Sequence, residues 1–179
     1  MTLEQLIIGL IRVAGSLPVL RWAFAGALIA IVVDFSDLFF MGVLDLGGLG
    51  NYQAFDKWLD IVYMLTFLWV ANKWTGPDRK IALALFGFRM IGFIGFELTG
   101  NRPILLIFPN VFEFWFVFVA MRKHYWPNYE MSRQRIVRWL LVVLVLKLGQ
   151  EWVLHGGQYL DSFTLFEAVE AIWDFLVFW

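Results

Sequence analysis

The chain has 179 residues, enough for one compact unit but too few for two ordinary domains. Hydrophobic residues make up 61% of the sequence and charged residues only 16%, so a soluble fold would lack polar surface. The net charge of −1 removes any compositional argument for nucleic-acid binding, and the absence of cysteine excludes disulfides and thiolate metal sites. The composition predicts an integral membrane protein whose first partner is the lipid bilayer.

Apolar residues recur along the chain in runs that predict helices. Through residues 1–16 their spacing is typical of an amphipathic helix that lies in the membrane interface. Longer runs follow, close to the 20 or so residues that a transmembrane helix needs and separated by glycine, proline and charged residues. They predict spans at residues 20–42, 56–74, 80–99, 103–121 and 135–155, with a sixth at 161–179. We expect an all-α integral membrane bundle of five to six transmembrane helices, a single polytopic domain over residues 1–179.

The last segment, residues 161–179, allows two interpretations. Glu167, Glu170 and Asp174 form one stripe of the expected helix and apolar residues form the other, as in a helix that lies on the membrane surface. A surface helix normally carries lysine or arginine for anionic headgroups, and this segment has none. We therefore favour a sixth span.

Basic residues are distributed unevenly between the two sides of the predicted bundle. One side receives Arg12, Arg21, Lys73, Arg79, Lys80, Arg122, Lys123, Arg133, Arg135 and Arg138. The other side receives Lys57 and Arg102. Because cytoplasmic loops carry an excess of lysine and arginine, we expect a multi-pass protein of the cell (inner) membrane with a cytoplasmic N-terminus.

Ionisable residues inside the predicted spans form two groups by depth. Such residues are costly in lipid and usually face the interior of a bundle. The helical rise of about 1.5 Å per residue brings Arg89, Glu113 and Lys147 close to the middle of the membrane. There we expect an ion-pair cluster of these three side chains.

The second group lies in the outer part of the hydrocarbon layer. It consists of Asp34, Asp37, Asp60, Glu97 and Glu151, with His155 at its outer edge. Carboxylates at one depth repel and raise each other's pKa, so bare anions need a cation, a shared proton or water. Carboxylates and histidine are also ligands of divalent metals. We expect a cation or proton cluster in an acidic pocket that opens outward, with a divalent cation as one candidate ligand.

Three functions stay open at this point. The preferred one is a cation- or proton-linked binding or transport site in the acidic pocket. The second is a metal-dependent, membrane-embedded enzyme that acts on a lipid or an isoprenoid, with unassigned catalytic residues. The third is a non-catalytic subunit of a homo-oligomer or a larger membrane complex, whose ion pairs are structural. No phosphate loop, HExxH motif or dinucleotide fingerprint decides between them.

Overall fold

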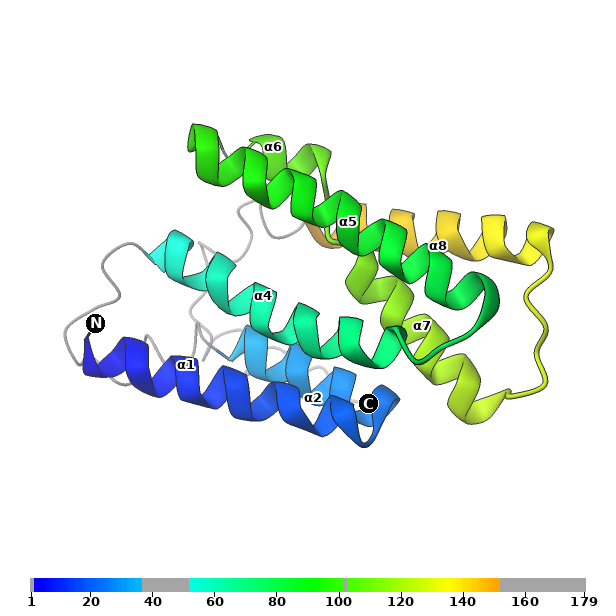
Figure 1. Ribbon diagram of the computed structural model, residues 1–179. Helices are drawn as coiled ribbons and strands as arrows, with labels where there is room; N and C mark the ends of the chain where they lie inside the picture. Colours follow the sequence, from blue (N-terminus) through cyan, green and yellow to red (C-terminus); the bar gives the residue numbers. More distant parts are fainter. Residues whose placement is uncertain (1, 37–51, 102, 152–179) are drawn as a thin grey trace, which may run out of the picture.

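The computed structural model describes residues 2–36, 52–101 and 103–151, and every regular element in this part of the chain is helical. The elements are α1 (Leu3–Ser16), the 3-10 helix η1 (Leu17–Leu20), α2 (Ala23–Phe35), α4 (Tyr52–Ala71), α5 (Gly76–Thr99), α6 (Pro103–Ile107), α7 (Val111–Tyr125) and α8 (Arg133–Glu151) (Figure 1). The all-α class is confirmed for the described residues. The predicted sixth span at 161–179 lies outside them.

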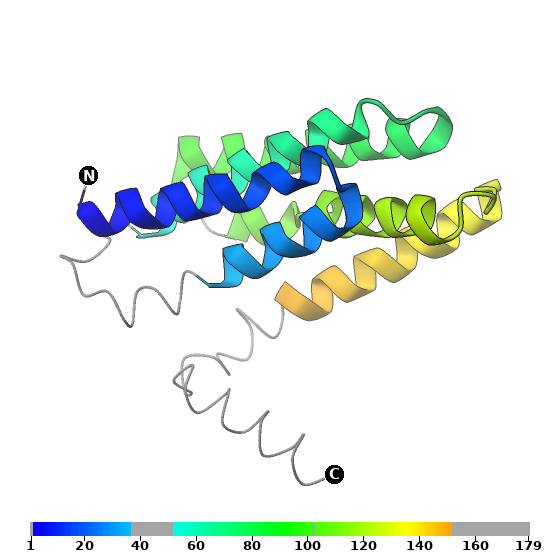
Figure 2. The same cartoon turned by 90° about the horizontal axis from the view of Figure 1, so that it is seen from below.

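Most helices run roughly lengthwise along the molecule, while α7 lies obliquely to them in the view of Figure 1 (Figures 1 and 2). At one end the start of α2 meets the end of α7, where the rings of Phe24 and Tyr125 pack edge to face with centroids 5.6 Å apart. The start of α5 joins this end through a 2.5 Å ion pair between Asp78 and Arg122. We call it the basic end because it carries Arg21, Lys73, Arg79, Lys80, Arg122, Lys123, Arg133, Arg135 and Arg138.

Helix α1 packs along α2 and α4 as part of the bundle, and its N-terminal end lies away from the basic end (Figure 1). Two glycines allow this close approach. A Cβ atom on Gly26 would lie 2.3 Å from the backbone nitrogen of Val19, and one on Gly15 would lie 2.9 Å from the Val33 side chain. The sequence predicted residues 1–16 as an interfacial helix, whereas the structure makes them one arm of a packed helical hairpin.

The two faces of α1 explain this difference. Ile8, Arg12 and Ser16, spaced four residues apart, are at most 4% exposed. Leu3 and Leu10, which belong to the apolar repeat of the sequence, are 58% and 61% exposed. A helix that packs through its more polar face shows the same periodicity as an interfacial helix, with the opposite face buried.

An aromatic core between α4 and α7 holds the middle of the bundle together. The rings of Phe67 and Phe116 stack with their centroids 4.3 Å apart. Phe112 and Trp115 on α7 are 0% exposed. Helix α7 is thus packed from several sides, which fixes the position of polar residues in its first turn.

Two stretches of the described residues are long and apolar enough to cross a membrane, Gly76–Thr99 and Pro103–Tyr125. Only 17% of the first stretch is buried inside the bundle. Helices α4 and α8 have the length of a span but carry three and five charged residues. The described part thus contains two such stretches, and the predicted five to six spans are not established by it.

Candidate functional site: a buried polar network

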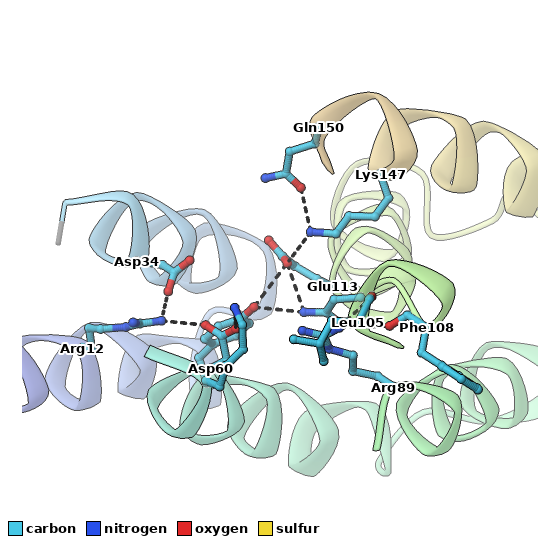
Figure 3. Close-up of polar contacts among 12 residues, drawn as sticks. Arg12, Asp34, Asp60, Arg89, Leu105, Phe108, Glu113, Lys147 and Gln150 are labelled. Carbon is cyan, nitrogen blue, oxygen red and sulfur yellow. Dashed lines mark hydrogen bonds and ion pairs between the residues drawn. The ribbon is translucent and has the colours of Figure 1, made fainter. Parts of the chain in front are cut away.

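Six charged side chains, one from each long helix, converge in the interior of the bundle (Figure 3). The cations are Arg12, Arg89 and Lys147, and the anions are Asp34, Asp60 and Glu113. With Tyr63 and Asn110 these residues form what we call the central polar network. Its members come from sequence positions more than a hundred residues apart, so only the fold brings them together.

The first part of the network is the Arg12 cluster. The Arg12 guanidinium donates to Asp34 on α2 and, over 2.8 Å, to Asp60 on α4. Lys57 lies 3.6 Å from the second oxygen of Asp60. Arg12 is only 4% exposed, whereas the sequence suggested a residue on the cytoplasmic side. The cation that offsets these two predicted acids is therefore a side chain of the protein itself.

The second part is the Glu113 cluster. Glu113 lies in the first turn of α7, where the helix dipole favours a negative charge. Its Oε2 atom accepts from the Tyr63 hydroxyl and from the Asn110 amide, both over 3.2 Å, and lies 3.7 Å from the Lys147 ammonium. Lys147 also donates to Gln150 over 2.7 Å. All members except Gln150 are at most 7% exposed.

A helix break adjoins the Glu113 cluster. The predicted span over residues 103–121 is interrupted at residues 108–110, between α6 and α7. Arg89 on α5 donates to the carbonyl of Phe108 over 3.0 Å and to that of Leu105 over 3.5 Å. Gly92, three residues further along α5, leaves room for Phe108, because a Cβ there would lie 2.3 Å from the Phe108 Cβ. Arg89 thus binds carbonyls that the break leaves without helical partners.

The structure divides the predicted ion-pair cluster of Arg89, Glu113 and Lys147. Lys147 and Glu113 come together, as the depth estimate suggested. The hydrogen bonds that Arg89 makes in the described part go to backbone carbonyls at the helix break. Arg89 therefore lies in the same network, but it binds the backbone carbonyls at the helix break.

The predicted outer acids have different surroundings. Asp34 and Asp60 meet at Arg12, whereas Glu97 is exposed on α5. Asp37, His155 and the side chain of Glu151 lie outside the described residues. Within the described ranges, no group of three or more histidine and acidic side chains has the arrangement of a metal site. The described members of the predicted divalent-cation cluster therefore do not come together as a metal site.

Sequence reasoning missed Arg12 and Tyr63 as members of the network. Arg12 had a usable signal, because Ile8, Arg12 and Ser16 repeat every four residues and define a second, more polar face of α1. Tyr63 also had one, since it lies three residues after Asp60 and therefore on nearly the same face of α4. Neither signal names the partner, because the partners lie on other helices.

A second buried charge site closes the basic end. Asp78, only 5% exposed, pairs with Arg122 over 2.5 Å and with Lys123 over 3.2 Å. Arg122 also donates to the carbonyl of Tyr129 over 3.3 Å. Asp78 and Arg122 border a cavity of about 440 Å³ next to the loop that follows α7. These contacts tie the start of α5 to the end of α7 and to that loop.

An apolar groove of about 370 Å³ leads to the Glu113 cluster. Its walls are α2 and α8, and its floor is α7. Phe35, Phe118 and Trp139 supply aromatic surface, while Glu113 and Gln150 are its polar lining residues. The volume lies within the range of about 300–1,000 Å³ that is usual for small-molecule sites.

No protein-family model matches the chain, and comparison with curated proteins and with solved structures gives no match. In its described residues the chain is an all-helical bundle with large apolar side chains on its exterior and paired charges in its interior.

Proposed function

We propose that the chain is a multi-pass protein of the cell membrane, and that Glu113 is the proton-accepting group of an intramembrane binding site. This keeps the proton-linked function expected from the sequence and moves its centre from the outer acids to the Glu113 cluster. The observation that carries the proposal is the buried Glu113 carboxylate, which lies beside a helix break and is shared by donors from α4 and α8 and by Asn110.

The distribution of polarity supports a membrane location. Charged side chains gather inside the bundle, while large apolar side chains such as Val32, Trp69, Leu98 and Val145 are 63–81% exposed. A soluble protein shows the reverse arrangement, and apolar patches on soluble monomers rarely exceed a few hundred Å². The arrangement fits helices whose outer faces contact lipid.

The same proposal sets an orientation. If the basic end faces the cytoplasm, as the excess of lysine and arginine favours, the N-terminal end of α1 faces the other side, because it lies away from the basic end (Figure 1). In this orientation the N-terminus does not face the cytoplasm, although the sequence led us to expect both the N-terminus and the basic side there. We keep the basic end on the cytoplasmic side, because its nine lysine and arginine residues support that orientation.

The chemistry of the Glu113 cluster supports a change of protonation there. Its carboxylate accepts from two neutral donors, Tyr63 and Asn110, and its cationic partner Lys147 lies at 3.7 Å, longer than a close ion pair. Asn110 Oδ1 is buried and has no hydrogen-bond partner in the described part of the chain. A protonated Glu113 becomes a donor, and rotation of the Asn110 amide would offer it that oxygen as an acceptor.

The helix break supports a binding site rather than a closed structural core. In many transporters, substrate and ion sites lie near the membrane midplane where helices are discontinuous. Tyr63 is the twelfth residue of the twenty-residue helix α4, so the cluster lies near half of its length of about 30 Å. Irregular backbone at such a depth is tolerated where protein buries it or where it lines a cavity.

One observation favours a second candidate function. Each carboxylate of the central polar network has a basic side chain as a partner, and paired charges inside a bundle also serve to fix helix packing. A non-catalytic subunit of a larger membrane complex would have such a network and no protonation change at Glu113. The two candidates therefore differ in one measurable property.

Infrared difference spectroscopy of the full-length protein in lipid vesicles measures this property. A pH titration should show a protonated-carboxyl stretching band that is lost in Glu113→Gln and retained in Glu97→Gln. Glu97 is the matched control because it is an exposed glutamate of the same bundle. Identical spectra for the wild type and Glu113→Gln, across the pH range in which both stay folded, would exclude the proton-linked site and leave the structural role.

A further inference from the structure

The apolar groove and its polar end point to a ligand. We infer that the groove between α2 and α8 binds an uncharged single-chain lipid with a hydroxyl group, a long-chain or isoprenoid alcohol, with the hydroxyl beside Glu113 and Gln150. The inference rests on the proposed function, because it supplies the ligand of the Glu113 site.

The groove runs along one face of α7. Its floor follows α7 from Glu113 to Met121, eight residues or about 12 Å of helix. Branched and aromatic side chains, including Phe118 and Val142, line it, and polar lining is confined to Glu113 and Gln150. One apolar chain with one polar group matches this distribution, whereas a compact polar metabolite does not.

Among the described residues, those at the rim of the groove are exposed. Val142 and Leu146 on α8, which line it, are 44% and 55% exposed. Phe35 on the opposite wall is 43% exposed. In the proposed membrane location these side chains face lipid, so an apolar chain that reaches the groove between the described parts of α2 and α8 exchanges lipid contacts for protein contacts.

The charge balance selects an uncharged head group. Glu113 already has its countercharge in Lys147, so an anionic head would place a second negative charge beside a buried carboxylate. The amide nitrogen of Gln150 makes no hydrogen bond within the described ranges, so it offers a donor to a ligand oxygen. A hydroxyl accepts such a bond and can donate one to a carboxylate, which has about four acceptor positions.

Photocrosslinking in vesicles tests the inference. The full-length protein is reconstituted in phosphatidylcholine with a trace of a long-chain alcohol that carries a diazirine on its chain, and crosslinked peptides are mapped by mass spectrometry. We expect crosslinks concentrated on the groove segments of α2, α7 and α8. An excess of unlabelled alcohol should remove them, whereas the corresponding fatty acid should not.

A matched pair of variants separates the groove from the general lipid surface. Val142→Trp fills the groove from its rim, while Val145→Trp, three residues along the same helix and 67% exposed, leaves the groove unchanged. The groove crosslinks should be lost in the first variant and retained in the second. Crosslinks spread evenly over the apolar surface would overturn the inference, as would equal loss in both variants or equal displacement by the fatty acid.

The crosslinking result can be distinguished from the infrared result that tests the proposed function. If groove crosslinks persist while the infrared band of Glu113 is absent, the lipid site stands and the proton-linked function fails. If Glu113 titrates while the alcohol crosslinks nowhere in particular, the proton-accepting group stands and this ligand is excluded. Neither measurement requires that a natural substrate be identified.

Discussion

The Arg12 and Glu113 clusters bury charge in opposite ways. In the Arg12 cluster one cation is shared by two carboxylates, and the side chains of Asp34 and Asp60 keep 27% and 16% of their exposure. In the Glu113 cluster one carboxylate is shared by a cation and two neutral donors, and every one of these side chains is buried. The Arg12 cluster therefore depends on its shared cation. The Glu113 cluster contains groups that can hydrogen-bond to Glu113 whether the carboxyl group is charged or protonated.

This difference separates two roles. Guanidinium groups stay charged under all ordinary conditions, so Arg12 remains a cation that ties α1, α2 and α4 together. The Glu113 cluster contains a carboxylate, a phenol, an amide and an ammonium, which allow several donor and acceptor arrangements. We therefore expect damage to the first cluster to affect stability, and damage to the second to affect protonation as well.

The largest expected effect concerns the path of α1, on which the Arg12 cluster depends. The native chain has no cysteine, so single cysteines can be placed at Leu3 and Asn128, which are exposed near opposite ends of the bundle. In intact cells a membrane-impermeant thiol reagent should label Leu3→Cys and should not label Asn128→Cys. Labelling of both from one side would mean that α1 does not run along α2, and the contacts of Arg12 would be lost with it.

The next effect is the stability lost when Arg12 is removed. Arg12→Met leaves Asp34 and Asp60 without their shared cation, and breaking a buried ion pair in this way costs about 3–5 kcal/mol. Unfolding in detergent measures the change, with Arg21→Met as the control, because Arg21 is exposed at the basic end. Adding Asp60→Asn to Arg12→Met should restore part of the loss. Equal stability of the Arg12 and Arg21 variants would show that the cluster contributes little.

Substitutions of Glu113 should separate loss of charge from loss of hydrogen bonds. Glu113→Ala leaves Lys147 without its carboxylate and Tyr63 without its acceptor, while Asn110 still donates to the Tyr63 hydroxyl over 3.0 Å, so we expect a loss of about 3–5 kcal/mol. Glu113→Gln keeps an acceptor for both neutral donors and should lose less, about 1.5–3 kcal/mol. Unfolding measurements on both variants compare the two losses. A glutamine variant as unstable as the alanine variant would mean that the neutral donors contribute nothing.

The sequence was sufficient for the helical class and for part of the network. Asp34, Asp60, Glu113 and Lys147 could be selected because charge in an apolar helix is costly wherever the helix packs. Their partners could not be selected, since whether Asp34 meets a metal, a proton or Arg12 depends on how helices from distant parts of the sequence pack. The periodicity of α1 was read correctly as helical, but its buried face was assigned by a rule for surface helices.

The helix break could not be predicted for a different reason. Pro109 is a visible signal, but proline occurs within continuous membrane helices when neighbouring groups satisfy the freed carbonyls. Only the position of Arg89 against Leu105 and Phe108 shows that here the backbone is opened and then held from α5. Pro109 could therefore be interpreted as the site of a helix break only once the contacts of Arg89 were known.

The smallest expected effect concerns Tyr63, which joins α4 to the Glu113 cluster. Tyr63→Phe removes one donor to a charged acceptor, a contribution of about 1.5–3 kcal/mol, and with it the hydroxyl that accepts from Asn110 over 3.0 Å. We expect the low end of this range, because the bond of 3.2 Å is long for a hydroxyl donor and Asn110 and Lys147 remain. Tyr125→Phe is the control, since Tyr125 is 58% exposed at the basic end. Unfolding measurements should place Tyr63→Phe between Tyr125→Phe and Glu113→Ala. A loss as large as that of Glu113→Ala would make Tyr63 the centre of the cluster, and the carboxylate would then be one of its partners.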